Sequence, residues 1–298
     1  MFLGKHLWAV VYTFLLLSFT VYLALDTFVI ARVYAEVEPE QSSSVQEEAS
    51  SSPSALMTEN SYQDENISIT ITEYRENETT VYVADVMLSS PEYLKTAFAQ
   101  NAYGRNVTEK TSEIAEGVNA LLAINGDYYG AQESGYVIRN GVIYRDTPKQ
   151  DGEDLVIYED GSFEIIEESE VTAEQLAANG AVQVLSFGPA LIENGRLSVL
   201  EDTEVGRSMA SNPRTAIGIV DNLHYVFVVS DGRTEESEGL SLLQLAEFMQ
   251  KLGVQTAYNL DGGGSSTMVF NGTVINNPTT SGRTISERSV SDIVYIAR

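Results

Sequence analysis

The hydrophobic pattern divides the chain into a long apolar stretch, a polar segment and a region of short alternating runs. Residues 7–25 are uncharged and strongly apolar, which is about the length that crosses a bilayer. Lys5 and His6 precede this stretch and acidic residues dominate after Glu36, so the charge bias places the rest of the chain outside the cytoplasm. The stretch is either kept as a membrane anchor or removed after Val33-Tyr34-Ala35, which resembles a small-residue cleavage site.

The polar segment is rich in Ser, Glu and Gln and contains Pro39 and Pro53. Such a composition buries too little apolar surface to offset the entropy of ordering the chain. We therefore expect a disordered linker at residues 36–62, between an anchor or signal segment at residues 1–35 and one folded domain at residues 63–298.

Pairs of alternating runs with turn residues between them predict antiparallel hairpins in the folded part. Asn-Gly or Asp-Gly dipeptides, which favour tight hairpin turns, separate three of the pairs. The expected strand pairs are Ile67–Tyr74 with Thr80–Met87, Val137–Arg139 with Val142–Tyr144, Leu155–Tyr158 with Phe163–Ile166, Ala216–Val220 with Leu223–Val229, and Val269–Phe270 with Thr273–Ile275.

Helical spacing of apolar residues is rarer than strand alternation. It predicts helices at Pro91–Gln100, Glu109–Asn119, Ala173–Ala178 and Leu242–Leu252. The last has the clearest end signals, because Ser241 and Gln244 form a capping box and Gly253 is a stop. Helices scattered among hairpins predict an α+β fold, with a mostly antiparallel mixed sheet and a few helices packed on it.

The run Asn259-Leu260-Asp261-Gly262-Gly263-Gly264-Ser265-Ser266-Thr267 joins two apolar stretches. Three consecutive glycines cost chain entropy and add no packing, so they indicate that something approaches the backbone closely. The run therefore predicts a site at a strand end or between two strands, with a tight turn that has no chemistry as the alternative. A phosphate-binding P-loop is disfavoured because no lysine follows the glycines.

Four further segments place polar or glycine residues at the ends of apolar runs, where a rigid scaffold usually presents functional groups. They are Ala123–Tyr129, Phe187–Ala190, Arg214–Gly218 and Ser230–Arg233. Together with the glycine run and Glu287-Arg288-Ser289-Val290, these segments resemble the phosphodiester glycosidase family, in order from about residue 120 to the carboxyl end. The pair R-T-A-I-G and N-L-D-G-G-G-S-S is the most distinctive part of the resemblance.

The resemblance implies an extracytoplasmic hydrolase that cleaves a sugar-1-phosphodiester at the glycosidic bond. An N-acetylhexosamine-1-phosphate diester in a cell-surface glycopolymer or exopolysaccharide is one such substrate, so the implied partner is an anionic glycan or glycolipid. The chain departs from the family at Asp127, Tyr128 and Tyr129, where glycine and phenylalanines are common, and at Ser289, where proline is common. These departures bear on the identity of the substrate.

The catalytic candidates are Asp261, Arg214 and Asp231. The guanidinium fork of Arg214 matches two phosphodiester oxygens, and Arg288 offers the same group for binding. Asp261 is the preferred acid, base or nucleophile, because glycines let substrate approach and hydroxyls tune the carboxylate. The alternatives are ordinary salt bridges for the arginines and turn-forming roles for the two aspartates.

Residues near the same strand ends are expected to bind the substrate. The set is Asn125, Asp127, Tyr128, Thr215, Asn259, Gly262, Gly263, Gly264, Ser265, Ser266 and Arg288. The glycine N–H groups and the two serine hydroxyls could form an anion-binding nest. Asn125 either orients a sugar hydroxyl or acetamido group or caps its own turn, and Tyr128 either stacks on a sugar face or packs.

Composition excludes several other classes of protein. The absence of cysteine excludes disulfides, thiolate metal sites and a cysteine nucleophile, and a formal net charge of -26 disfavours a nucleic-acid partner. His224 lies in an alternating run and is expected at the surface or in a cross-strand pair.

Two other readings of the candidate residues stay open. No cofactor is expected, although Asp127, Asp231 and Asp261 could hold a hard cation such as calcium without any calcium-loop motif. A non-catalytic module that binds cell-wall or exopolysaccharide glycans would use the same arginines and glycines without needing an ionisable Asp261.

Overall fold

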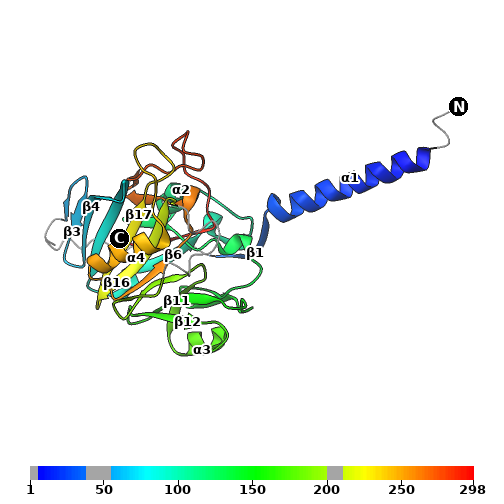
Figure 1. Cartoon of the computed structure of the whole chain (residues 1–298). Coiled ribbons are helices and arrows are strands. Elements are labelled where there is room, and N and C mark those ends of the chain that lie inside the picture. Colours follow the sequence, from blue (N-terminus) through cyan, green and yellow to red (C-terminus); the bar gives the residue numbers. More distant parts are fainter. Residues whose placement is uncertain (1–5, 38–54, 200–210) are drawn as a thin grey trace, which may run out of the picture.

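A computed structural model describes residues 6–37, 55–199 and 211–298 of the chain. Helix α1 (Leu7–Phe28) projects from the folded domain, and none of its residues is buried (Figure 1). With 22 residues and a mean hydropathy of 2.0, α1 is long and apolar enough to cross a membrane. The apolar stretch expected at residues 7–25 is therefore helical and extends three residues further.

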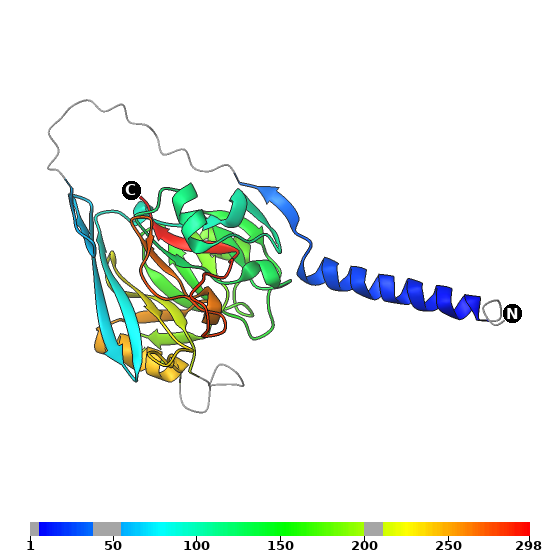
Figure 2. The ribbon, with the colours of Figure 1, turned by 90° about the horizontal axis from the view of Figure 1, so that it is seen from above.

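The folded domain begins earlier than the sequence suggested. Strand β1 (Arg32–Glu36) follows α1 closely and pairs with β7 (Ala102–Arg105), and the Asn106 side-chain amide donates to the carbonyls of Thr27 and Ile30 at 3.1 and 3.2 Å. The segment expected as a linker, residues 36–62, includes β2 (Leu56–Met57) and most of β3 (Ser61–Gln63). Its central part, residues 38–54, lies outside the described residues (Figure 2).

Every strand pairing in the described residues is antiparallel, as the hairpin pattern predicted. The largest sheet has the order β15 (Arg196–Leu197), β14 (Ala190–Glu193), β18 (Thr256–Asn259), β16 (Arg214–Asp221), β17 (His224–Ser230), β5 (Thr79–Leu88), β4 (Ile67–Glu76), β3 (Ser61–Gln63) and β2 (Leu56–Met57).

Two five-stranded sheets complete the domain. The first has the order β10 (Val142–Arg145), β9 (Val137–Arg139), β13 (Ala181–Leu185), β11 (Glu153–Tyr158) and β12 (Phe163–Glu167). The second has the order β20 (Thr273–Val274), β19 (Met268–Phe270), β8 (Leu122–Asn125), β21 (Asp292–Ile296) and β6 (Leu94–Phe98). All five hairpins expected from the sequence are present, as β4–β5, β9–β10, β11–β12, β16–β17 and β19–β20.

The side-chain alternation of the long strands separates two hydrophobic cores. On β5, Tyr82 and Ala84 face a core shared with both five-stranded sheets, whereas Val81 and Val83 face a core shared with helix α4 (Leu242–Lys251). Because successive strand residues point to opposite faces, one sheet supports both layers. Helix α4 lies over β16 and β17 in Figure 1.

The helix predictions were correct for three segments and wrong for one. Helices α2 (Thr111–Gly117), α3 (Ala173–Ala178) and α4 form, and Ser241 and Gln244 make the predicted capping box. The segment 91–100, expected as a helix, instead contains the short 3-10 turn Pro91–Tyr93, strand β6 and the start of another turn at Ala99–Asn101. Strand β6 pairs along its length with β21, and this distant partner overrides the local helical preference.

Candidate active site

The glycine run carries the chain from the largest sheet to the second five-stranded sheet. It follows β18, forms a 3-10 turn at Gly263–Ser265, and enters β19. Antiparallel pairing brings the start of β16 beside the ends of β17 and β18, with Arg214 opposite Ser230 and Ala216 opposite Asn259. The sequence therefore placed the run correctly, between two strands.

Asn125 at the end of β8 holds the glycine run in place. Its side-chain amide donates to the Asp261 carbonyl at 2.6 Å, and its Oδ1 accepts from the Thr215 hydroxyl at 2.8 Å and from the Thr267 N–H at 3.2 Å. All of these groups are buried. Asn125 and Thr215 thus lie in the site as expected, but their polar groups bind protein atoms and fix the backbone of Asp261.

The Asp261 carboxylate lies at the centre of this arrangement and is 8% exposed. Its Oδ2 accepts from the Ser265 hydroxyl at 2.5 Å and from the Arg288 guanidinium at 2.9 Å, and Oδ1 takes part in neither bond. Burial raises the pKa of Asp261, and the charge of Arg288 and the Ser265 hydrogen bond oppose that rise. A buried, asymmetrically bonded carboxylate of this kind can act as a base or nucleophile.

Arg288 and Arg214 approach the glycine run from different segments. Arg288 donates through Nε and Nη2 to the Ser265 hydroxyl and through Nη2 to the Gly262 carbonyl at 3.4 Å. Arg214 is 6% exposed, and its Nε donates to the Leu240 carbonyl at 2.8 Å. A Cβ on Gly262 would lie 4.0 Å from the Arg214 Cδ, so both arginines border the run.

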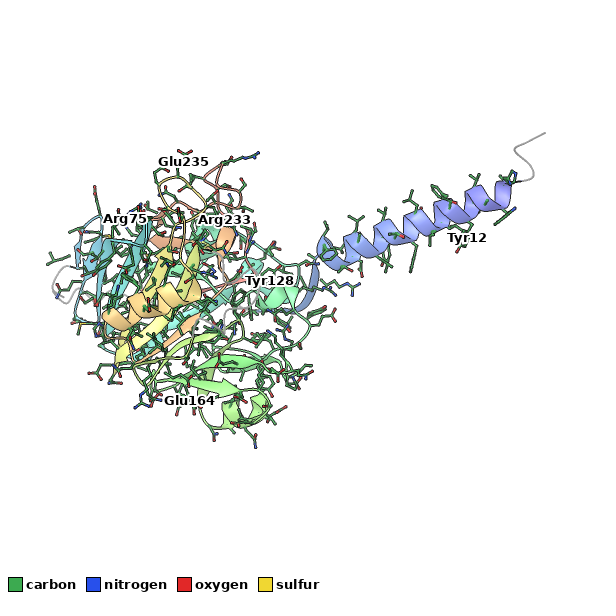
Figure 3. All side chains as sticks on the ribbon, in the orientation of Figure 1. Tyr12, Arg75, Tyr128, Glu164, Arg233 and Glu235 are labelled. Atoms are coloured by element: carbon green, nitrogen blue, oxygen red, sulfur yellow. The ribbon has the colours of Figure 1, made fainter. Side chains whose placement is uncertain are left out.

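A third arginine, Arg233, borders the same run. A Cβ on Gly263 would lie only 2.8 Å from the Arg233 Nη2. Figure 3 shows Arg233 on the loop after β17, whose outer end carries Glu235. In the sequence, Arg233 lies in the segment Ser230–Arg233, but only Asp231 of that segment was a catalytic candidate. Its cationic group at a strand end next to a glycine was the signal that could have identified it.

Several buried polar atoms of the run have no hydrogen-bond partner within the described residues. They are Asn259 Oδ1, Ser266 Oγ and Thr267 Oγ1, whereas the Asn259 side-chain amide donates to the Gly188 carbonyl at 2.7 Å. Buried polar groups are nearly always paired in proteins. Three such atoms within nine consecutive residues make this run a candidate place for a polar ligand.

The expected nest of glycine N–H groups is only partly available. The Gly263 N–H donates to the Pro213 carbonyl at 2.8 Å, and the Ser265 hydroxyl donates to Asp261. The Ser266 hydroxyl is among the unpaired groups. The arginine side chains, more than the backbone, therefore offer donors for an anion here.

Three other expected site residues make no hydrogen bond to the Asp261 side chain within the described residues. Asp127 is fully buried and forms an ion pair with Arg139 at 2.8 Å, so its carboxylate binds a protein group. Asp231 accepts from the backbone and side chain of Asn277 at 2.8 and 2.9 Å, and the Asn276 side-chain amide donates both to Asp231 at 3.4 Å and to the Ser266 carbonyl of the glycine run at 2.9 Å. Tyr128 is 44% exposed, and Figure 3 shows it nearer α1 than Arg233 is.

Other candidate roles have simple structural explanations. Tyr129 is buried and stacked on Tyr103 with ring centroids 5.3 Å apart, which is packing and not sugar binding. His224 faces Asp85 across the β5–β17 pair at 3.1 Å, as its alternating position suggested. In the described residues no three His, Asp or Glu side chains are grouped to hold a metal ion.

A buried network of charges supports the loop after β8. Arg139 binds Asp292 at 2.7 Å as well as Asp127, and burial followed by the charge of Asp127 raises the pKa of Asp292 to about 7. Asp154 and Glu168 lie nearby in the same interior, where burial and then the charge of Glu168 raise the pKa of Asp154 to about 9. Two cavities of about 180 and 270 Å³ lie elsewhere and are lined by none of the residues around Asp261. The candidate site is therefore identified by its side-chain chemistry and not by a cavity.

Several known proteins are similar to this chain in sequence. YomE, an uncharacterized SPbeta prophage-derived protein of Bacillus subtilis, is 28% identical over 180 residues, covering 59% of this chain and 28% of its own length. The human N-acetylglucosamine-1-phosphodiester alpha-N-acetylglucosaminidase is 38% identical over 112 residues, covering 34% of this chain and 22% of its own. The chain thus spans little more than a quarter of these relatives at most.

A solved structure has the same fold along most of the chain. It is the catalytic domain of the zebrafish N-acetylglucosamine-1-phosphodiester alpha-N-acetylglucosaminidase, auto-inhibited by its pro-peptide, with a TM-score of 0.62 and 21% identity over 91% of this chain and 89% of that one. A model of the phosphodiester glycosidase family matches residues 118–297, which include the glycine run and all three arginines. The chain therefore belongs to the phosphodiester glycosidase family.

Proposed function

We propose that the protein is an extracytoplasmic hydrolase that cleaves a sugar-1-phosphodiester at the glycosidic bond. The observation that carries this proposal is the buried Asp261 carboxylate, bonded to Arg288 and Ser265 on a glycine turn that two further arginines border. The human and zebrafish relatives carry names that describe cleavage of a sugar phosphodiester. An anionic substrate in a protein with 43 acidic residues needs such local cationic groups.

The reaction would break the bond between the anomeric carbon and the phosphate oxygen. Water supplies the new anomeric hydroxyl, and the phosphate leaves with the electron pair of the broken bond as a phosphomonoester. Because this leaving group is already anionic, the arginines can stabilise its growing charge. Asp261 would either take a proton from the attacking water or attack the anomeric carbon itself, and the two routes remain alternatives.

The substrate we propose is an anionic glycan or glycolipid outside the cytoplasm. Helix α1 is long and apolar enough to act as an anchor. Strand β1 follows the carboxyl end of this helix and joins it to the domain by pairing with β7. A domain held in this way would work close to a membrane or cell surface. Cleavage in the segment Val33-Tyr34-Ala35 would remove part of β1, so the uncleaved anchor is the form that keeps the strand pair with β7.

The test uses a sugar-1-phosphodiester with a nitrophenyl group on the phosphate. Cleavage at the anomeric carbon releases nitrophenyl phosphate, which becomes coloured only when a phosphatase is added. Colour without phosphatase would show cleavage at phosphorus instead, and activity on the matching simple nitrophenyl glycoside alone would show that the phosphate is not recognised. Either result would contradict the proposal.

The variant Asp261→Asn separates the hydrolase from a binding module. The amide keeps the shape of the side chain and removes the ionisable group, so turnover should vanish while substrate binding stays measurable. Asp221→Asn, at the exposed far end of β16, is the matched control and should keep full activity. Full activity in Asp261→Asn would move the catalytic role to another acid, and normal binding without turnover in the unmodified protein would favour the binding module.

Arg214→Lys tests the planar fork at the start of β16. Lysine keeps the charge but cannot reproduce two parallel hydrogen bonds or the contact of Nε with the Leu240 carbonyl. We expect a fall in turnover of roughly two to three orders of magnitude, the usual effect of losing one transition-state donor. A turnover within a few fold of the unmodified protein would show that Arg214 acts only as a positive charge.

A further inference from the structure

The loop after β17 holds Arg233 in an unusual conformation. Its φ is +63°, a left-handed value that residues other than glycine rarely adopt. The neighbouring chain is shaped around it, because a Cβ on Gly282 would lie 1.9 Å from the Arg233 carbonyl oxygen and one on Gly263 would lie 2.8 Å from its Nη2. Such local strain often occurs at functional sites, where the surrounding structure maintains it.

The hydrogen bonds of Arg233 leave its charge without a carboxylate partner among the described residues. Nη1 donates to the Thr280 carbonyl at 2.6 Å, and Nε and Nη2 donate to the Asn212 Oδ1 at 3.3 and 3.1 Å. These acceptors are neutral, and they engage three of the five N–H groups of a guanidinium. One N–H on each terminal nitrogen therefore remains for a further acceptor.

Arg288 brings a second positive charge to the same turn. Its bonds to Asp261, Ser265 and Gly262 all use Nε and Nη2, so Nη1 takes part in none of them, and the side chain is 40% exposed. Burial and the charge of Arg288 lower the pKa of Arg233. The two guanidinium groups are thus close enough to repel each other, which an anion between them would relieve.

We propose that Arg233 and Arg288 together form the seat for the phosphate, binding its oxygens over the turn at Gly263–Ser265. This inference rests on the proposed function for the identity of the ester, but it concerns the phosphoryl group alone. Arg233 lies on the loop 231–241 and Arg288 on the loop 277–289. The hydrogen bond from Arg233 to the Thr280 carbonyl connects these two loops. Arg214, buried and bonded to a backbone carbonyl, borders the turn at Gly262.

The seat would bring the anomeric carbon of the substrate towards Asp261. Arg288 bridges the phosphate seat and the carboxylate, since its Nη2 contacts the Asp261 Oδ2 while Nη1 takes none of these bonds. A phosphoryl group on Nη1 would place the attached anomeric carbon on the Asp261 side of the turn. The product phosphomonoester carries more charge than the diester, so the same seat should also retain product, and inorganic phosphate should compete with substrate.

The experiment is a calorimetric titration of inorganic phosphate into the full chain in detergent. The unmodified protein should bind phosphate, and Arg233→Gln should weaken binding by roughly tenfold to a hundredfold, the usual effect of losing charge-assisted hydrogen bonds. Arg283→Gln is the matched control, because it removes the same charge from an exposed position on the loop 277–289. It should bind phosphate as the unmodified protein does.

Equal weakening in both variants would show a general effect of charge and would overturn the seat, as would unchanged binding in Arg233→Gln. Arg233→Lys covers the case in which the glutamine variant fails to fold. It keeps the charge, so it should bind more weakly than the unmodified protein through loss of the second prong, and equal affinity would refute the two-pronged contact.

Hydrolysis is scored separately in the phosphodiester assay. A protein that binds phosphate through Arg233 but hydrolyses no phosphodiester would keep the seat and reject the proposed reaction. A protein that hydrolyses the ester with phosphate binding insensitive to Arg233 would do the reverse.

Discussion

Asp154→Asn should change how the stability of the domain depends on pH. Asp154 is fully buried, and its carboxyl group lies beside Glu168 and the Ser186 hydroxyl. Burial, followed by the charge of Glu168, raises the pKa of Asp154 from 3.8 to about 9. The folded protein therefore holds this carboxyl group in its neutral form at pH 7, where it can donate a proton to Glu168.

The direction of the effect follows from the two pKa values. Below about pH 4 the carboxyl group is protonated in both the folded and the unfolded protein, so its ionisation does not change the free energy of unfolding. As the pH rises towards 9, the unfolded chain ionises and the folded chain does not, which favours unfolding. Each pH unit above the unfolded pKa lowers the free energy of unfolding by about 1.4 kcal/mol, so the loss at pH 7 is on the order of 4 kcal/mol.

Asparagine keeps the shape and removes this cost. The gain in unfolding free energy of Asp154→Asn over the unmodified protein should therefore grow from about pH 4 to about pH 9 and then level off. Thermal unfolding of the full chain in detergent, followed by far-ultraviolet circular dichroism, measures this difference. Tryptophan fluorescence would not serve, because the single Trp8 lies in α1. Asp146→Asn, an exposed neighbour, is the control. Parallel pH profiles for Asp154→Asn and the unmodified protein would refute the reasoning.

Three further predictions follow from the site and its support. Arg288→Gln removes the charge that opposes the raised pKa of Asp261, so the acid limb of the variant's pH–activity profile should move to higher pH. If this limb does not move, it reports the ionisation of another group. Arg139→Met leaves Asp127 and Asp292 unpaired in the interior and should cost about 3–5 kcal/mol of unfolding free energy, less at low pH; a thermal midpoint within a degree would contradict this. Protease added to intact cells should release the domain, and full protection would place it in the cytoplasm.

The sequence predicted those elements whose signals are local. The β4–β5 and β9–β10 hairpins form because period-two alternation and turn residues act within about twenty residues, and the capping box of α4 lies within four. Strand β6 was predicted as a helix because its partner β21 lies nearly two hundred residues away. Strand β1 was missed because its sequence adjoins a membrane-like stretch and gives no sign of pairing with β7.

The same division applies to the candidate site. Strand ends rich in glycine and polar residues identified the segments that meet around Asp261, and Arg214 and Arg288 border them. The ion pair of Asp127 could not be predicted, since the sequence shows its partner Arg139 only as the end of a hairpin strand. Arg233 needed knowledge of how two loops pack, because its only pattern, Asp-Gly-Arg, reads as an ordinary turn.

The three glycines of the run face three different parts of the chain. A Cβ on Gly262 would lie 3.0 Å from the Pro213 carbonyl beside Arg214, one on Gly263 would meet Arg233, and one on Gly264 would lie 2.3 Å from the Thr280 hydroxyl on the loop that carries Arg288. Each missing side chain therefore lets one arginine-bearing segment approach the turn next to Asp261. Consecutive glycines are needed because three segments converge within a single 3-10 turn, which leaves no neighbouring position where a larger residue would fit. Close approach of the protein to itself, and not only of a ligand to the protein, thus accounts for the run.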